Sequence, residues 1–321
     1  MSAPAELLAL RAIEGCGFLL AVLPVPSLIR QLVPPSRLAL HLGLWGTYMG
    51  TGTAVAIAGG PWLIDALGWK GLWVVLSLAS AVAAAALALR VPADHLRRQA
   101  AGATATASAP SAAPMPATPA APPGWTARLR TTLGRAGPWR VAITFAMYSS
   151  QWLAVIGFLP AIYAQAGVSG RTAGLLTAAA CLANVVGNVA SGRLLHRGMC
   201  ARHLLTIGFV AMTATAFVAF SPLTADAPLV RMLAVVLFSA VGGLIPATLF
   251  ALAVQVAPNE HTVSTTVGWM QQCSSAGQFL GPPLVGWVAG VAGGWHGTWV
   301  ITGLASAVGL LLARGTRYRS A

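Results

Sequence analysis

The chain has 321 residues, of which 57% are hydrophobic and 8% are charged, and its mean hydropathy is +0.75. Soluble globular domains carry roughly a quarter charged residues, so this composition excludes that class and indicates an integral membrane protein. The net charge of +13 would by itself suggest nucleic-acid binding, but its distribution along the chain points instead to membrane topology.

Nine apolar segments of transmembrane length predict an all-α, polytopic membrane fold, because the ten-residue alternation of a membrane barrel is absent. Three segments precede a polar interruption, and six follow it. The first three cover 6–29, 41–64 and 72–89. The other six cover 139–163, 171–194, 203–222, 228–256, 263–291 and 298–312. We therefore expect a partial N-terminal bundle of three helices at 1–90, a disordered cytoplasmic linker at 91–138 and a six-helix bundle at 139–321.

The interruption from Arg90 to Arg140 orients the chain. It holds seven of the nineteen Lys and Arg residues, and basic loops remain in the cytoplasm. With this loop inside, fifteen basic residues fall on the cytoplasmic face and three, Lys70, Arg171 and Arg231, on the other. The sequence thus predicts an inner-membrane protein with a cytoplasmic C-terminus and an external N-terminus, and nucleic acid is not needed as a partner. The uncharged Ala, Pro, Thr and Ser residues at 100–124 predict disorder.

The residue types that usually catalyse reactions or bind metals do not form the pattern of an enzyme site. The four cysteines show no CxxC spacing and the six histidines are dispersed, so we expect no metal, cofactor or disulfide framework. No span holds paired carboxylates or a Ser-His pair, which disfavours a membrane enzyme. The first ten residues lack the pattern of a secretory signal.

Charge and glycine mark the first two segments. Arg11 and Glu14 lie one turn apart, and charges within an apolar helix mark a functional locus unless they reach the membrane surface. Glu14 is the only acid predicted deep in a span, so it is the candidate for proton exchange, with Arg11 as its partner. In the second segment, Gly59, Gly60 and Pro61 predict close packing or a bend.

These residues resemble a known family. Arg11-x-x-Glu14-Gly15 is similar to the fourth-helix signature Arg-x-x-Gln-Gly of the major facilitator superfamily, with Glu in place of Gln. Gly52 and Gly59-Gly60-Pro61 resemble a loose form of its fifth-helix, antiporter-associated signature. The basic loop then resembles the family's central linker. The resemblance implies a fold of two bundles that alternate access to a central cavity, here without the first three of twelve helices.

The end of the fifth segment resembles the family's gating loop. There, Gly187 permits close helix contact, and Arg193 and Arg197 would pair with acids or helix ends. The acidic member of that pattern is absent, with Ser191 near its place. The two arginines therefore have the alternative role of topology anchors.

Three polar stripes lie at membrane depth and are expected to turn inward. They are Tyr148, Gln151 and Trp152; Asn184, Asn188 and Ser191; and Gln271, Ser275 and Gln278. Except for the two serines, we take these residues as substrate-binding candidates. Their alternative role is to join helices by hydrogen bonds.

The sequence predicts a secondary transporter of a small solute. Proton coupling is the natural hypothesis, and the amide and aromatic lining suits a neutral molecule or a small anion. Gly157-Phe158-Leu159-Pro160 is somewhat similar to cyanate-permease-like branches. The alternative is a truncated, non-transporting remnant, or a half-transporter that needs a partner. The lipid bilayer and a small-molecule substrate are the expected partners, and homo-oligomers would bury an exposed bundle face.

Overall fold

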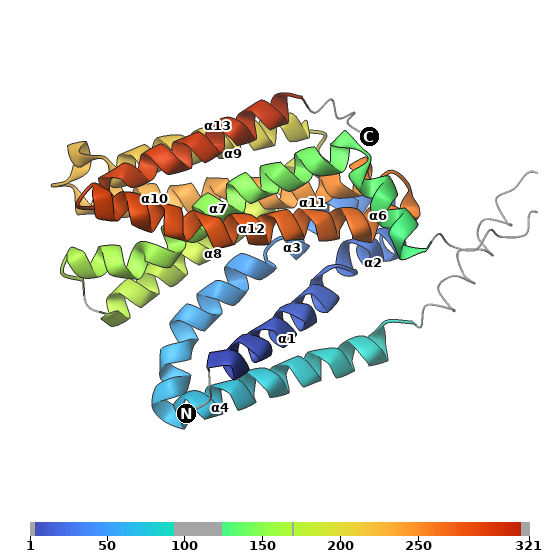
Figure 1. Ribbon diagram of the computed structural model, residues 1–321, viewed down its shortest axis with the longest axis horizontal. Coiled ribbons are helices and arrows are strands. Elements are labelled where there is room, and N and C mark those ends of the chain that lie inside the picture. The colour runs from blue at the N-terminus through green and yellow to red at the C-terminus, as the bar shows by residue number, and fades with distance from the viewer. Residues whose placement is uncertain (1–3, 93–123, 169, 316–321) are drawn as a thin grey trace, which may run out of the picture. The chain divides into compact units, whose positions relative to one another are not determined.

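The computed structural model describes residues 4–92, 124–168 and 170–315, and these residues form helices and the turns between them (Figure 1). The chain divides into two compact units, one made of Met1–Ile57 with Pro123–Ala321 and the other of Ala58–Pro122. The central part of the predicted disordered linker, 93–123, lies outside the described residues.

The first unit begins with helices that are broken where the sequence predicts continuous segments. Its first segment forms α1 (Pro4–Val22) and α2 (Val25–Leu32), and the second begins with η1 (Pro35–Arg37) and α3 (Leu38–Trp45) before α4 (Tyr48–Arg90). Pro24 explains the first break, because proline has no N–H for the helix ladder and disfavours helical geometry in the residue before it.

In the second unit, the single departure from helical geometry within α4 is at Gly68, where φ is 69° and ψ is 171°. Glycine adopts this conformation without the steric cost that a Cβ brings. Gly68 therefore divides α4 at the turn predicted between the second and third segments. The helix continues through Pro61.

The remaining helices belong to the first unit and, except for α6, follow the predicted segments to within a few residues, with α10 and α11 sharing the segment 228–256. They are α6 (Trp125–Leu133), α7 (Ala136–Gln165), α8 (Gly170–His196), α9 (Ala201–Phe220), α10 (Pro228–Gly242), α11 (Leu244–Val256), α12 (Val263–Val291) and α13 (Thr298–Arg314). Short turns η2 (Pro222–Thr224), η3 (Glu260–Thr262) and η4 (Trp295–Gly297) join some of them.

One part of the predicted linker is helical rather than disordered. Helix α6 occupies Trp125–Leu133, within the stretch 91–138 that the sequence analysis assigned to a disordered tether. Thr132 is buried, and the Trp139 indole donates a hydrogen bond of 2.9 Å to the Leu133 carbonyl. These tertiary contacts stabilise a helix that composition alone does not predict.

Seven stretches of the described chain are long and apolar enough to cross a membrane. One of them, Pro35–Arg90, has 56 residues, which at about 1.5 Å per residue is enough for two crossings of a core about 30 Å thick. Helix α12 falls outside these seven but has 29 residues. Dividing the long stretch and adding α12 gives the nine segments that the sequence predicts.

Helix α11 lies at the centre of the first unit. Every residue from Leu244 to Val254 is buried, as expected for a helix that is apolar on all sides and surrounded by others. Around it lie α3, α7, α8, α9 and α12. Helix α11 is separated from α10 at Gly243, three residues before Pro246, whose ring cannot continue the hydrogen-bond ladder.

Helices α7 and α12 pack backbone to backbone. A Cβ on Gly277 would lie 2.6 Å from the Ala146 carbonyl oxygen, and a Cβ on Gly281 would lie 2.5 Å from that of Ser150. No side chain fits at either position unless the two helices move apart. The pair of glycines therefore sets the distance between α7 and α12.

Replacing Gly281 by alanine should lower the unfolding midpoint of the detergent-solubilised protein, because overpacking a tight contact typically costs about 1–3 kcal/mol. Gly290→Ala in the same helix is the control, since a Cβ there meets nothing within 4 Å. That variant should be neutral or slightly stabilised through its higher helix propensity. Equal midpoints for the two variants would contradict the close approach.

Candidate functional site

A cavity lies inside the first unit, enclosed by α3, the start of α4, α7, α8, α11 and α12. Its volume is about 60 Å³, room for about two water molecules at the ~30 Å³ that each occupies in the liquid. The lining residues are Gly46, Tyr48, Met49, Thr53, Phe145, Tyr148, Ser149, Trp152, Leu153, Asn184, Pro246, Phe250, Gln271, Ser274 and Gln278. All of them are uncharged at neutral pH, and five are aromatic.

Asn184 on α8 is the most connected polar group of the cavity. Its Nδ2 donates to the Tyr148 hydroxyl and to the Ser239 carbonyl, each at 2.9 Å. Its Oδ1 accepts a 2.9 Å bond from Nδ2 of Asn188, one turn further along the helix. Asn184 and Asn188 are both almost fully buried. The amide therefore joins α8 to α7 and to α10 while one edge faces the cavity.

Gln271 on α12 connects the cavity to the N-terminal helices. Its Nε2 donates a 3.1 Å bond to the hydroxyl of Tyr48, a residue 223 positions earlier in the chain. Its Oε1 is buried and has no hydrogen-bond partner among the described residues. A buried carbonyl oxygen without a donor is costly, so it is suited to accept a hydrogen bond from a molecule in the cavity.

Aromatic rings form much of the wall. Phe145 and Tyr148 stack nearly parallel with ring centroids 6.1 Å apart, and Phe145 meets Phe250 edge-on at 5.6 Å. The Trp152 indole donates to the Ser239 hydroxyl at 3.1 Å, which fixes its ring. These rings give flat apolar surfaces beside the amides, a combination found in small-molecule pockets.

Two helix interruptions meet at the cavity. Gly46, between α3 and α4, would place a Cβ 2.4 Å from the Asn188 side-chain oxygen. On the other side, Gly243, between α10 and α11, would place one 2.2 Å from the Asn184 carbonyl. Interrupted helices at membrane depth supply close backbone approach and free polar groups, which is how many transporters build their sites.

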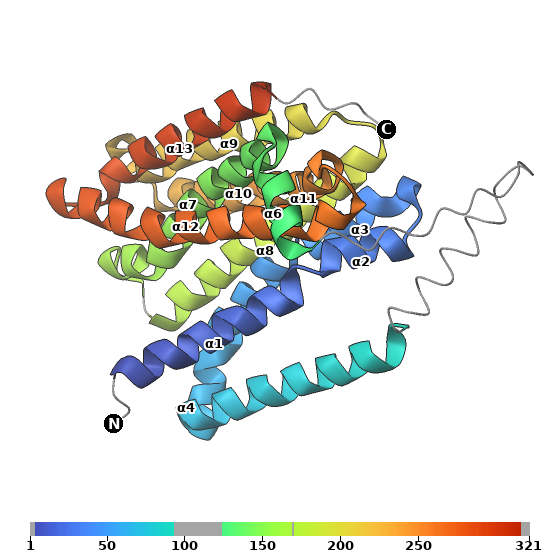
Figure 2. The same cartoon turned by 45° about the vertical axis from the view of Figure 1, so that its right-hand side comes forward.

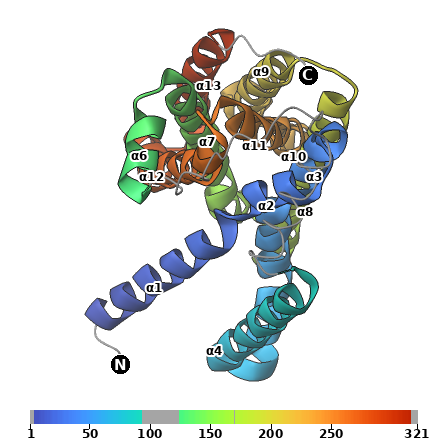
Figure 3. The same ribbon diagram turned by 90° about the vertical axis from the view of Figure 1, so that its right-hand side faces the viewer.

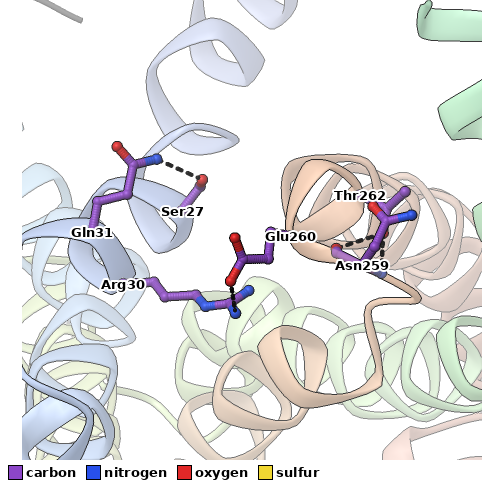
Figure 4. A network of polar contacts seen from close by, with 6 residues as sticks. All are labelled: Ser27, Arg30, Gln31, Asn259, Glu260 and Thr262. Atoms are coloured by element: carbon purple, nitrogen blue, oxygen red, sulfur yellow. Dashed lines mark hydrogen bonds and ion pairs between the residues drawn. The ribbon is translucent and has the colours of Figure 1, made fainter. Parts of the chain in front are cut away.

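One end of the first unit is closed by an apolar cluster beneath an ion pair. Leu42, Ala251, Val254 and Val263 are buried against one another. Above them, Arg30 of α2 pairs with Glu260 of η3 at 3.1 Å (Figure 4). We call this combination the closed end. Figure 2 shows α2 and α3 beside the C-terminal helices there.

This chain resembles a known protein family in sequence and a solved structure in fold. A model of the Major Facilitator Superfamily matches residues 1–267 and, in an overlapping match, residues 141–320. The chain belongs to the Major Facilitator Superfamily. The crystal structure of a variant of the E. coli fucose:proton symporter FucP has a similar fold, with a TM-score of 0.62 and 16% identity over 91% of this chain and 72% of that one. No curated protein matches the sequence.

Family membership makes the chain a multi-pass membrane transporter rather than an enzyme. It also gives the cavity its context, because members bind small-molecule substrates within the lipid bilayer. The cavity contains five of the seven residues predicted to bind substrate: Tyr148, Trp152, Asn184, Gln271 and Gln278.

The other two predicted residues do not line this cavity. Asn188 is buried behind Asn184. Gln151 accepts a 3.1 Å bond from Ser306 of α13 and donates one to the Met147 carbonyl, so it joins helices. In α12, Ser274 lines the cavity, while Ser275 of the predicted stripe is exposed, a shift of one residue that turns the side chain by about 100°.

Several lining residues were missed because they come from the predicted second segment or from an apolar helix. Tyr48 and Thr53 contribute polar atoms at the start of α4, and Phe250 and Pro246 come from α11. The sequence signal for Tyr48 was its hydroxyl within a largely apolar segment, two residues after Gly46. Phe250 had no such signal, since its neighbours are equally apolar.

The predicted coupling pair lies apart from the cavity lining. Arg11 Nη1 donates to Glu14 Oε2 at 2.6 Å, and the two side chains are 66% and 54% exposed within the protein. The contact agrees with their one-turn spacing. Their role in coupling stays a prediction.

The predicted gating residues lie in different surroundings. A Cβ on Gly187 would approach the Ala240 carbonyl oxygen and Gly243, so α8 packs tightly on α10 there. Arg193 and Arg197 are exposed near the end of α8. Gly59, Gly60 and Pro61 belong to the second unit, where a Cβ on either glycine meets nothing within 4 Å.

Reversing the charge of Arg30 should loosen the closed end. An exposed ion pair contributes up to about 1 kcal/mol, so opening should increase up to about fivefold. The measurement is the rate of maleimide labelling of Ala251→Cys, which is 8% exposed, in a chain with its four native cysteines changed to alanine.

Arg37→Glu, a charge reversal on the neighbouring turn, is the control and should leave labelling unchanged. The double exchange Arg30→Glu with Glu260→Arg should restore slow labelling. If Arg30→Glu and Arg37→Glu accelerate labelling equally, net charge and not the pair is responsible.

Proposed function

We propose that this chain is a secondary transporter that moves a small neutral solute or small anion through the cavity by alternating access. The observation that supports this most directly is Gln271 Oε1, a buried acceptor without a partner among the described residues, in a cavity built at two helix interruptions. Its lining offers hydrogen bonds and aromatic faces without a full charge.

The closed end supports the alternating-access part of the proposal. Residues of the N-terminal helices, such as Leu42 and Arg30, meet residues of the C-terminal helices there through contacts that can separate without breaking a helix. A second contact at this end joins His196 of α8 to the Ser36 carbonyl, with Nδ1 at 2.7 Å. We take these contacts to close the cavity on this side.

Charge distribution supports the orientation that we propose. Within the first unit, Arg30 near the end of α2, Arg193 near the end of α8 and Arg314 at the end of α13 lie at the same end of the bundle, so this end should be cytoplasmic in an inner membrane. The closed end, at η1 and the C-terminal end of α8, would then be the cytoplasmic end of the cavity.

Ligand binding should stabilise the fold and depend on Gln271. We would screen the purified protein with acetamide, glycerol and fucose as neutral solutes, and with acetate and cyanate as small anions. A binder at a hundredfold excess over its Kd should stabilise the protein by about 2.7 kcal/mol. Gln271→Leu should weaken binding by about tenfold, because the site loses a hydrogen bond at a buried acceptor.

Gln255→Leu is the matched control, since Gln255 on α11 is exposed, and it should keep the affinity of the unchanged protein. Uptake of the binding solute into proteoliposomes then tests transport. If a folded protein binds none of the five probes, or if the two glutamine variants bind alike, the cavity is not the site. A bound solute that never crosses would favour the non-transporting remnant.

Glu14 is proposed to couple uptake to protons, with Arg11 as its partner. Glu14→Gln should abolish uptake driven by a pH gradient, because that process requires a net proton transfer. Solute exchange measured in the absence of a gradient should be unchanged. Glu6→Gln, an exposed carboxylate in the first turn of the same helix, should behave as the unchanged protein. Undiminished driven uptake in Glu14→Gln would remove this residue from the mechanism.

A further inference from the structure

A second hollow lies on an exposed face of the first unit, and nothing in the transport mechanism uses it. Its lining residues come from α12, α13 and, on its floor, α7, three helices that pack against one another (Figures 1 and 3). Its volume is about 320 Å³, and we call it the outer groove. The lining residues are Met147, Ser150, Gln151, Gly277, Leu280, Gly281, Leu284, Val285, Ile301, Leu304, Ala305 and Val308.

The floor of the outer groove offers no free polar side chain for a polar ligand. Ser150 Oγ donates to the Met147 carbonyl at 3.2 Å. Gln151 is held by Ser306 and by the Met147 carbonyl. The groove therefore suits an apolar occupant along its length.

The rim of the groove is apolar and faces outward. Leu280, Leu284 and Leu304 are 63%, 45% and 61% exposed. In a chain that spans a bilayer, such a face meets acyl chains and not water. An unfilled hollow would forfeit the dispersion contacts of its walls, so an acyl chain lying in it is favoured.

Arg140 marks one end of the groove. Its Nη1 donates to the Gly315 carbonyl at 2.9 Å, which brings the start of α7 to the end of α13. Arg314, the last residue of α13, lies about 130° around that helix from the groove-lining residues, so it is on another face. Met147 and Gln151 lie seven and eleven residues after Arg140, about two and three helical turns, so all three share one face of α7.

The spacing matches one lipid molecule. Seven residues of helix place Met147 about 10 Å along the axis from Arg140, within the reach of an acyl chain whose headgroup lies at the helix ends. Basic pockets between transmembrane helices are known to hold anionic headgroups. The groove and Arg140 are thus arranged as the two parts of a single site.

We propose that the outer groove binds one anionic phospholipid, with its phosphate at Arg140 and an acyl chain between α12 and α13. The lipid would hold α13 against α7 beside Gln151. Neither the transported solute nor the coupling ion enters this inference, so it stands or fails independently of the proposed function.

The test is native mass spectrometry of the purified full chain titrated with phosphatidylglycerol or phosphatidylcholine. One phosphatidylglycerol should remain bound per chain at concentrations where phosphatidylcholine does not. Arg140→Gln should weaken retention by about fivefold, the effect of one basic residue near a lipid headgroup, whereas Arg314→Gln should not. Ala305→Phe, which fills the groove without changing charge, should remove the bound lipid.

Arg202→Gln is the matched control, because Arg202 is exposed at the start of α9 and is not part of the groove. It should retain phosphatidylglycerol as the unchanged chain does, and inorganic phosphate should not displace the lipid. Circular dichroism identifies any variant that fails to fold. Equal retention of the two lipids, equal losses in Arg140→Gln and Arg202→Gln, or full retention in folded Ala305→Phe would each overturn the proposal.

Discussion

The geometry of the cavity depends on the close approach of three backbones around the middle of α8. Gly46 on one side and Gly243 on the other leave no room for a Cβ against Asn188 and Asn184. These two contacts place the interruption between α3 and α4, and the one between α10 and α11, against the same two turns of α8. Side chains that are far apart in the sequence, such as Tyr48 and Gln271, therefore come within hydrogen-bond distance.

That arrangement places uncharged polar groups where full charges would be expensive. Asn184 makes three hydrogen bonds, two to other helices and one to its own, so its desolvation is largely offset. Gln271 keeps one oxygen without a partner among the described residues. Asn184 therefore joins helices, whereas the unpartnered oxygen of Gln271 is the group that we propose as a contact for the solute.

Periodicity and hydropathy predict the helices of this chain because burial in a bilayer demands long apolar runs. The bounds of α12 match the prediction at both ends. The inward direction of Asn184 and Gln271 was also predictable, since an amide facing lipid is unfavourable.

Other features depend on contacts that a single sequence does not reveal. Tyr48 joins the cavity only because Gly46 lets α3 approach α8. Gln151 looked equivalent to Tyr148 on the same stripe, but its bond to Ser306 of α13 takes it out of the cavity. Helix α6 forms within a predicted linker, where Trp139 reaches back to the Leu133 carbonyl. In each case the deciding partner comes from tertiary packing or from a turn that the pattern does not predict.

The closed end is stabilised strongly by apolar packing and weakly by an ion pair. Leu42 and Val263 are almost completely buried. An opening path would fill with water. Exposing such a side chain to that water would cost about 1.5–3 kcal/mol. The ion pair of Arg30 and Glu260 adds less, since Glu260 is 84% exposed and exposed pairs are worth up to about 1 kcal/mol. In the proposed alternating access, apolar packing would therefore set how rarely this end opens, and the ion pair would adjust the balance within a range that ionic strength can change.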